Sequence, residues 1–449
     1  MDLKDIDTWR KQLGLLPVPL FRDSNDESQF ILLNGVKGNF CLDLRESQLD
    51  YLSARSIAWS SNVGYYLTLS GGHIIVQRWN RQLGQTESYK YQDVTNKLQE
   101  FHGYLENTNP DSSLSVVTHG ARAFRSLRTA LGNEASGTDA LRAFLLLLAS
   151  ASEHTSPDSV DLSKWNLDKE SLNIASMVAP QDWEILVSEF ARGRSVDDLN
   201  LRVDLLLRHA SGLMFQEAHY EALLPTHLQL SLGLFPPDPA RLTKQSTGIG
   251  LHFTPPALAR TLVEECLASL PLRQISNLKI FDPACGSGEF LREALRQLRL
   301  SGFSGQIELE GWDISDAACA MAKFALAWDI SEGSPGKFEV KHQNSLNPDV
   351  PWPSADLLLM NPPFLSWQDM NSEQRALVSA TLGSDLRKRP DLSAAFMVKA
   401  SVSVYRPFGV LKHTLRLDGT SGRDLFFPWR HCLIFFRHAD LRGTPSREL

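Results

Sequence analysis

The feature that most constrains the fold is a regular alternation of apolar strands and amphipathic helices that begins near residue 278. Four short segments predict strands, and helical patterns separate the first three of them: LKIFD, QIELEGWD, KFEVKHQ and ADLLLM. Strands that alternate with helices at this period form right-handed βαβ units. The predicted fold class is therefore α/β, with a doubly wound, Rossmann-like parallel sheet covered by helices on both faces.

The chain is too long for one compact domain, because its 449 residues exceed the ~250 to 300 at which single cores stop growing. The pattern of residues 1–110 predicts a mixed α/β region, in which Ser70-Gly71-Gly72 separates the two strands of a hairpin. Residues 111–240 predict a helical region, which ends in the Pro- and Gly-rich segment FPPDPARLTKQSTGIG. The α/β domain should occupy residues 241–409, followed by an atypical tail over 410–449.

Composition excludes several classes of protein. A net charge of −7 argues against a protein that coats nucleic acid by bulk charge, although it permits a local basic face. The five cysteines lack CxxC spacing, and His154, His209 and His219 lack ligand spacing, so no metal site is expected. The N-terminus does not resemble a signal peptide, and no apolar run approaches the ~20 residues of a membrane helix. We expect a cytoplasmic protein.

A glycine-rich loop follows the first predicted strand. It reads Phe281-Asp282-Pro283-Ala284-Cys285-Gly286-Ser287-Gly288, and its small residues allow a ligand to approach the backbone. A tight turn without a ligand is the structural alternative. Leu291 stands where a dinucleotide fold needs its third glycine, and Asp282 would repel a phosphate. The loop therefore favours a ligand with a cationic group.

A second carboxylate, Asp313, ends the next predicted strand. There it could accept hydrogen bonds from both hydroxyls of a ribose. The alternative is that Asp313 caps the helix that begins near Ser315.

The fourth strand leads directly into Asn361-Pro362-Pro363-Phe364. The Asn361 side-chain oxygen and the Pro362 carbonyl could accept the two hydrogens of an amine and so concentrate electron density on its nitrogen. The prolines would hold these acceptors in place, and Phe364 could stack on a base. A proline-rich turn with a buried phenylalanine is the structural alternative, which the preceding strand disfavours.

Together these motifs resemble the amino-methyltransferases of DNA, specifically the adenine N6 methylases of restriction-modification systems. FTPP at 253–256 is similar to the family's first motif, FDPACGSGEFL to its cofactor loop and NPPF to its catalytic tetrapeptide. The resemblance implies S-adenosylmethionine as cofactor, with Phe253 and Thr254 beside its methionine part and Asp313 on its ribose. Asn344 stands where the family usually has an aspartate that contacts the cofactor's adenine. Asp282, Ala284, Gly286 and Gly288 complete the implied cofactor site.

The resemblance also implies DNA as a partner, with the target adenine flipped out of the duplex, and a possible restriction or specificity subunit. Trp367 could line the base pocket or simply pack the next turn. Arg387, Lys388 and Arg389 could meet phosphates, or could form a solvated loop.

Two questions stay open at this stage. The family's pattern dissolves after Gly409, and the tail has no clear strand, helix, strand order and only one long apolar run, CLIFF, as if the native reading frame ended there through a frameshift or truncation. The NPPF loop also serves methyltransferases of ribosomal RNA and of protein glutamine, and a chain that lost its last strands could be a non-catalytic binding subunit.

Overall fold

The computed structural model describes residues 2–21, 28–34, 37–45, 49–80, 86–108, 112–193, 199–223, 254, 256–331, 336–383, 389–404 and 433–436. The chain divides into two compact units. The first, here called the N-terminal unit, is Met1–Leu230 with Pro255–Leu258, and the second, the C-terminal unit, is Ser231–Thr254 with Ala259–Leu449. The predicted boundary near residue 240 lies outside the described residues. No described helix is both long and apolar enough to span a membrane.

The N-terminal unit contains a six-stranded sheet in the order β1-β2-β3-β4-β5-β6. Its strands are β1 Leu16–Pro19, β2 Gln29–Asn34, β3 Lys37–Asp43, β4 Tyr65–Ser70, β5 His73–Arg78 and β6 Glu87–Lys90. Its helices are α1 Ile6–Leu13, α2 Tyr51–Ser60, α3 Tyr91–Asn96 and α4 Leu98–Asn107. β3 and β4 pair in parallel and the other neighbours antiparallel, so α2 is the crossover between the parallel strands.

The predicted hairpin at Ser70 is confirmed. β4 and β5 pair antiparallel from Tyr65 opposite Arg78 to Ser70 opposite His73. Gly71 and Gly72 form the turn with φ of +56° and +78°, conformations that only glycine adopts without strain and that suit a two-residue hairpin.

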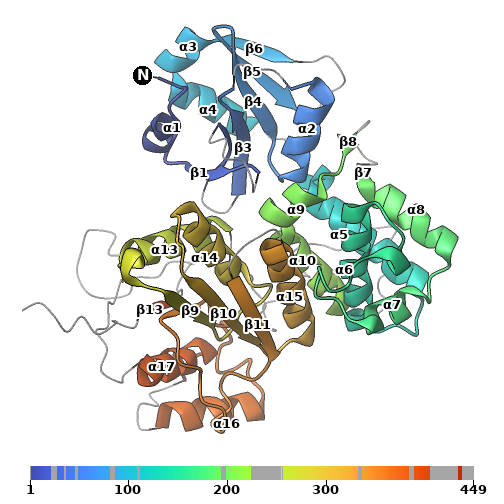
Figure 1. Ribbon diagram of the computed structural model, residues 1–449, viewed down its shortest axis with the longest axis vertical. Coiled ribbons are helices and arrows are strands. Elements are labelled where there is room, and N and C mark those ends of the chain that lie inside the picture. The colour runs from blue at the N-terminus through green and yellow to red at the C-terminus, as the bar shows by residue number, and fades with distance from the viewer. Residues whose placement is uncertain are drawn as a thin grey trace, which may run out of the picture. The chain divides into compact units, whose positions relative to one another are not determined.

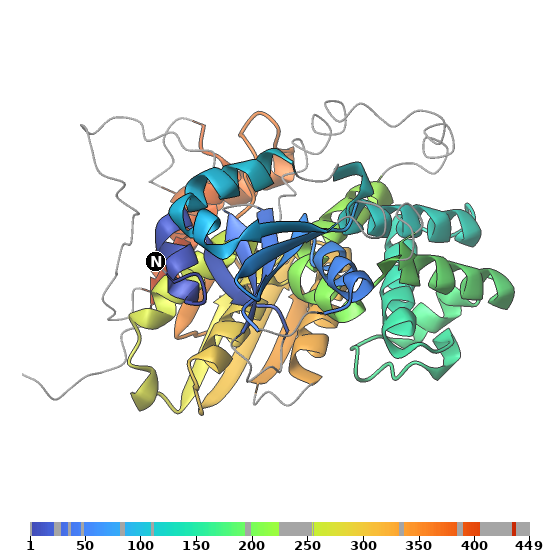
Figure 2. The ribbon, with the colours of Figure 1, turned by 90° about the horizontal axis from the view of Figure 1, so that it is seen from above.

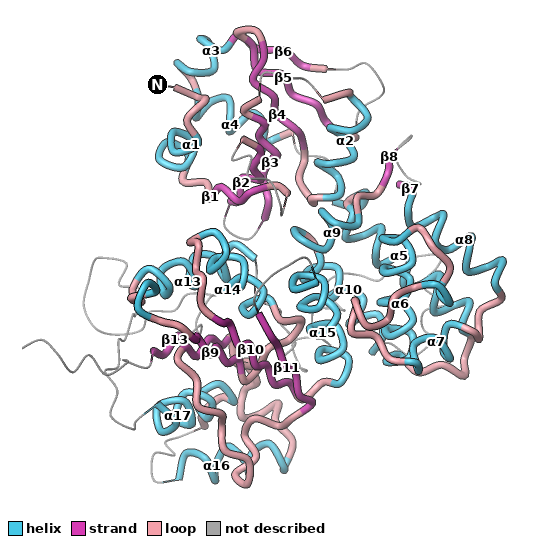
Figure 3. Tube along the Cα trace, in the orientation of Figure 1, coloured by secondary structure: helices cyan, strands magenta, loops and turns pink. Residues whose placement is uncertain are grey.

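The predicted helical region forms a group of helices in the same unit (Figure 3). They are α5 Val116–Leu131, α6 Gly137–Glu153, α7 Lys169–Ala175, α8 Pro180–Ala191, α9 Val203–His209 and α10 Ser211–Leu223. Hydrogen bonds link this part of the chain to helix α2 beside the sheet. Trp59 Nε1 donates to the Leu114 carbonyl at 3.0 Å, and the Asn200 amide donates to Ser56 Oγ at 3.1 Å. The division into separate domains at residue 110 stays a prediction.

The C-terminal unit has the predicted doubly wound architecture. Its sheet runs in the order β11-β10-β9-β12-β13. The strands are β9 Asn277–Asp282, β10 Gln306–Asp313, β11 Gly336–His342, β12 Leu357–Met360 and β13 Leu433–Phe436. β11, β10, β9 and β12 run parallel to one another, and the chain order reverses between β9 and β12. In sheets of this kind, such a switch point is where ligands bind.

Helices cover both faces of this sheet (Figures 1 and 2). They are α13 Pro256–Ala268, α14 Glu289–Leu300, α15 Asp316–Ser331, α16 Ser372–Leu382 and α17 Leu392–Val404. Phe281 and Leu358 point to the face where Phe396 of α17 packs, in one apolar cluster with Trp312 and Trp352. Because side chains alternate along a strand, the buried Ile280 points to the opposite face, where α14 and α15 contact the sheet.

One described strand of the tail lies beside the strand that precedes the NPPF loop. Leu433–Phe436, from the tail's only long apolar run, forms β13 and pairs antiparallel with β12. The pairing closes the edge that β12 would otherwise present, as an antiparallel edge strand on a parallel sheet commonly does. The other residues of 410–449 lie outside the described residues, so the hypothesis of a shifted frame stays a prediction.

Candidate active site

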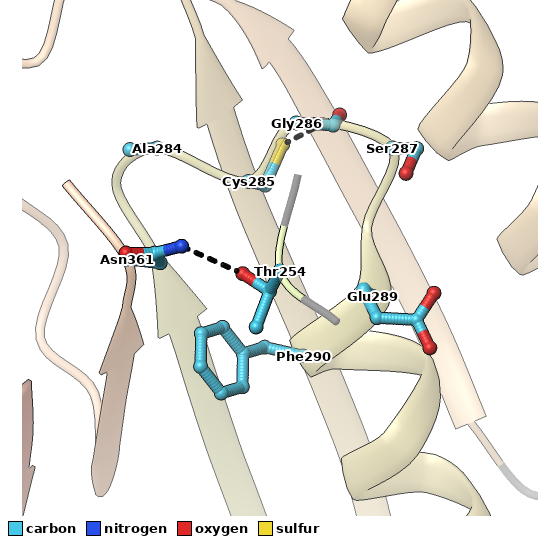
Figure 4. Close-up of a pocket in the computed structure, with 8 residues that line it drawn as sticks. All are labelled: Thr254, Ala284, Cys285, Gly286, Ser287, Glu289, Phe290 and Asn361. Atoms are coloured by element: carbon cyan, nitrogen blue, oxygen red, sulfur yellow. Dashed lines mark hydrogen bonds between the residues drawn. The ribbon is translucent and has the colours of Figure 1, made fainter. Parts of the chain in front are cut away.

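The carboxyl ends of the parallel strands bring the predicted site residues to one edge of the sheet. Asp282 lies opposite Gly311, two residues before Asp313, and Phe281 lies opposite Leu358, three residues before Asn361. A pocket opens there, lined by Thr254, Ala284, Cys285, Gly286, Ser287, Glu289, Phe290 and Asn361 (Figure 4). Its walls are the loop after β9 with the first residues of α14, the start of the loop after β12, and Thr254, which lies two residues before α13.

The loop after β9 has the shape that its glycines predict. Gly286 and Gly288 have φ of +53° and +84°, and Gly288 is the N-cap of α14. A Cβ on Gly288 would lie 3.4 Å from the Cβ of Ala322 on α15, an ordinary contact, so the positive φ is what requires the glycine. The Cys285 amide donates to the Trp312 carbonyl at 2.9 Å, which ties the loop to the end of β10.

Asp313 holds the loop from the neighbouring strand. Its Oδ2 accepts from the Gly286 amide at 2.9 Å and its Oδ1 from the Ser315 amide at 2.8 Å. The N-cap of α15 is Ser315, whose hydroxyl accepts from the Ala318 amide at 3.2 Å, so capping does not account for Asp313. A carboxylate has about four lone-pair sites, so the two bonds leave acceptor capacity for a ligand. Burial raises the pKa of this carboxyl.

Asp282 is a buried carboxyl without a cationic partner. Burial raises the pKa of this carboxyl, the Ala284 amide, which donates to its Oδ1 at 3.0 Å, lowers it, and the nearby Asp313 raises it, so that the pKa is about 8. No described lysine or arginine forms an ion pair with Asp282. A cationic ligand group would offset this cost. The donor set therefore fits S-adenosylmethionine, which carries a sulfonium and an ammonium.

Asn344 lies just beyond β11, in a segment that is tied to the same loop. Its Oδ1 accepts from the Leu346 amide at 3.0 Å. The next residue, Ser345, donates from its hydroxyl to the Pro283 carbonyl at 2.5 Å and accepts from Trp352 Nε1 at 2.8 Å through its own carbonyl. Asn344 thus keeps its Nδ2 hydrogens and one oxygen lone pair for a ligand.

Asn361 faces the pocket from the end of β12. Its Nδ2 donates to Thr254 Oγ1 at 3.2 Å, and its Oδ1 points away from Thr254 (Figure 4). Pro362 is buried, whereas Pro363 and Phe364 are half-buried. The amide thus has one end committed to the protein and the other free to act as an acceptor.

Several predicted residues do not join this pocket. Trp367 packs against the apolar cluster under α16 and α17, with the guanidinium of Arg375 6.0 Å from its ring centroid. Arg389 is exposed. Phe253, Arg387 and Lys388 lie outside the described residues.

Other residues reach the site although they were not predicted. Cys285, Ser287, Glu289 and Phe290 line the pocket, and each lies within the segment FDPACGSGEFL. Ile314 follows Asp313 at the sheet edge and is 68% exposed, which is unusual for a large apolar side chain. An apolar residue directly after a strand-end carboxylate is the signal that could have identified it.

Part of the chain matches a known protein family. Residues 240–395 match the model of the N-6 DNA methylase family. A Listeria monocytogenes protein described as a class I S-adenosylmethionine-dependent methyltransferase is 14% identical, with a TM-score of 0.34 over 64% of this chain and 70% of that chain. A type I restriction-modification system methyltransferase subunit from Streptococcus thermophilus is also 14% identical, with a TM-score of 0.29 over 65% of this chain and 72% of that chain.

The match spans the glycine-rich loop, both strand-end carboxylates and the NPPF loop, which the structure gathers at one edge of the sheet. Residues 240–395 therefore match a domain of the N-6 DNA methylase family.

Proposed function

We propose that this chain is a site-specific methyltransferase in which Asn361 and the Pro362 carbonyl accept the two hydrogens of the adenine amine. The observation that carries the proposal is the orientation of the Asn361 amide. Its nitrogen donates a hydrogen bond to Thr254, which leaves its oxygen as an acceptor at the pocket. The adenine amine is a poor nucleophile because its lone pair is delocalised into the ring. Two fixed acceptors favour the pyramidal, electron-rich nitrogen that the transition state requires.

The loops around the pocket supply the groups that would hold the cofactor. S-adenosylmethionine, when bound, supplies the methyl group as an electrophile. The buried Asp282 carboxylate would offset its positive charge, and Asp313 would accept from its ribose hydroxyls. Phe253 and Thr254 would contact the methionine part, whereas Asn344 and the exposed Ile314 would contact the adenine. The small residues Ala284, Gly286 and Gly288 let a ligand approach the loop backbone.

The target base must leave the duplex to reach this edge of the sheet. Phe364 offers a ring for stacking on a flipped adenine, at ~1 to 3 kcal/mol by analogy with single-strand binders. Trp367 and the basic run Arg387, Lys388 and Arg389 belong to the same proposal, as a second aromatic contact and as phosphate contacts. A restriction or specificity subunit is the partner that the resemblance to restriction-modification methylases suggests.

The test is a transfer assay with cofactor labelled in its methyl group. The full-length protein is incubated with duplex DNA of varied sequence, ribosomal RNA and protein, and labelled DNA is digested to identify N6-methyladenine. The proposal expects label in DNA alone, at adenine N6. Label in RNA or in protein glutamine would replace it with one of the other two substrate classes.

Asn361→Ala tests the catalytic assignment. It should abolish transfer and leave the dissociation constant of the cofactor nearly unchanged, because the acceptor acts on the target amine. Asn371→Ala is the matched control, since Asn371 caps α16 by accepting from the Gln374 amide at 2.8 Å and should cost about 1 kcal/mol of stability while transfer persists. Loss of cofactor binding in Asn361→Ala would contradict the assigned role.

A further inference from the structure

We propose that Thr254 is a positioning residue for catalysis, which sets the orientation of the Asn361 amide through the hydrogen bond between Asn361 Nδ2 and Thr254 Oγ1. The two atoms are 3.2 Å apart although 107 residues separate them in sequence. Figure 4 shows the two side chains meeting across the pocket, with the Asn361 oxygen turned away from Thr254. This inference rests on the proposed function, in which Asn361 Oδ1 accepts a hydrogen of the target amine.

An asparagine amide has two ends with opposite hydrogen-bonding character. Its oxygen only accepts and its nitrogen only donates, and a half-turn about χ2 exchanges them. The flipped amide would present its own NH2 to the NH2 of adenine, so two donors would face each other. Rotation about this sp³–sp² bond is soft, so the backbone does not decide between the two orientations.

The second acceptor of the loop has no such ambiguity. The Pro362 carbonyl belongs to the backbone, and Pro363 restricts the ψ angle of the residue before it, which sets the direction of that carbonyl. The only group of the acceptor pair that can turn to the wrong orientation is therefore the Asn361 amide. Thr254 is the residue whose hydrogen bond opposes that turn.

The hydroxyl of Thr254 can control the amide only if its own hydrogen is directed elsewhere. A threonine hydroxyl donates once and accepts twice, so on its own it could also donate to the oxygen of a flipped amide. If an acceptor in the pocket takes the hydroxyl hydrogen, Thr254 Oγ1 offers only lone pairs and accepts the Asn361 amide in one orientation. The cofactor's methionine carboxylate is such an acceptor, so cofactor binding would prepare the amide for the target base.

Two substitutions separate the hydroxyl from the shape of the side chain. Thr254→Val keeps the shape and removes the hydroxyl, and we expect single-turnover transfer at saturating cofactor to slow about tenfold, as for the loss of one hydrogen bond in the transition state. Thr254→Ser keeps the hydroxyl and should restore the rate. A rate for Thr254→Val equal to wild type, or a serine variant as slow as the valine variant, would overturn the proposal.

The cofactor's part is tested with decarboxylated S-adenosylmethionine, which keeps the sulfonium and the ammonium. In the wild-type protein this donor should slow single-turnover transfer to a similar extent as Thr254→Val does. In the valine variant it should cause no further slowing, because both changes remove the same control. Independent, multiplying losses would show that the carboxylate does not act through Thr254.

A spectroscopic measurement keeps the test independent of turnover. In full-length protein with 15N-labelled asparagine, the Asn361 side-chain signal is identified by its absence in Asn361→Ala. Adding S-adenosylhomocysteine, which carries the carboxylate and no transferable methyl, should move this signal in wild type and in Thr254→Ser but not in Thr254→Val. The same shift in all three proteins would overturn the inference, whereas lack of adenine transfer with the expected shifts would count against the proposed function alone.

Discussion

The Asp313 carboxylate at the end of β10 accepts a hydrogen bond from the Gly286 amide at 2.9 Å and thereby fixes the glycine-rich loop that follows β9. The loop is thus positioned by the neighbouring strand as well as by its own glycines. A residue that would bind the ribose also shapes the loop that would hold the rest of the cofactor.

Asp313→Ala should weaken cofactor binding by about ten- to one-hundredfold, because it removes charge-assisted hydrogen bonds worth ~1.5 to 3 kcal/mol. Isothermal titration calorimetry measures the dissociation constant directly. Asp168→Ala is the control, since Asp168 caps α7 in the N-terminal unit by accepting from the Ser171 amide at 2.9 Å. It should lower stability without changing cofactor affinity. Unchanged affinity in Asp313→Ala would contradict the role of Asp313.

Asp282→Asn should stabilise the ligand-free protein at high pH while it weakens cofactor binding. The usual pKa of an aspartate is 3.8, and burial raises that of Asp282 to about 8. The folded protein therefore holds this proton more tightly than the unfolded chain does. The stability that comes from this tighter proton binding is fully present below pH 3.8, declines as the pH rises, and is lost above about 8.

Thermal unfolding of both proteins across this pH range checks the effect of Asp282. Asparagine keeps an oxygen for the Ala284 amide and carries no charge, so the melting temperature of the variant minus that of wild type should increase between pH 4 and 8 and then level off. Saturating S-adenosylmethionine should reverse the order, because it stabilises the protein that binds it. A difference that does not change with pH would show that Asp282 is not protonated in the folded protein.

Much of the site could be predicted from sequence because strand ends carry the chemistry. Asp282 and Asp313 each end a strand and Asn361 follows one, and parallel strands place their carboxyl ends at one edge of the sheet. The alternation of strands and helices does not specify the strand order, so the switch point between β9 and β12 required the structure. The contact of Thr254 with Asn361 was also unpredictable, because no periodic pattern relates residues so far apart.

The N-terminal sheet shows the limit of local signals. The turn at Gly71 and Gly72 predicted one hairpin, whereas the Asn-Gly signal at Asn34-Gly35, between the antiparallel strands β2 and β3, was missed. Helix α16 was missed although Asn371 and Gln374 form a capping box, which is a signature that sequence can reveal. Strand β13 was missed because its pairing with β12 depends on contacts made after the rest of the sheet has formed.

Gly288→Ala should lower both stability and cofactor affinity. Alanine at φ of +84° is strained by roughly 1 to 2 kcal/mol at the start of α14, beside the pocket. Gly302→Ala is a matched control, because Gly302 has φ of +68° and open space around its Cβ position. It should show a similar loss of stability with cofactor affinity unchanged. Equal effects of both variants on affinity would mean that strain anywhere in the unit weakens binding.

The buried ion pair between Arg292 and Asp329 should matter far more for stability than exposed pairs do. Arg292 Nε lies 2.5 Å from Asp329 Oδ2, with the side chains 3% and 9% exposed, and it joins α14 to α15 behind the cofactor loop. Arg292→Met leaves a buried carboxylate without this partner and should cost about 3 to 5 kcal/mol. Lys11→Ala breaks the pair with Asp7, whose side chains are 71% and 54% exposed, and should change stability by less than about 1 kcal/mol.

Urea unfolding of the two variants measures this difference, and Arg292→Met combined with Asp329→Leu identifies its cause. If the loss in Arg292→Met comes from the unpaired charge, replacing both partners with apolar side chains should recover most of the stability. If it comes from lost packing around the long arginine side chain, the double variant should be no more stable than the single one. A loss in Arg292→Met as small as that in Lys11→Ala would contradict both accounts, because it would mean that solvent reaches Asp329 and stabilises its charge.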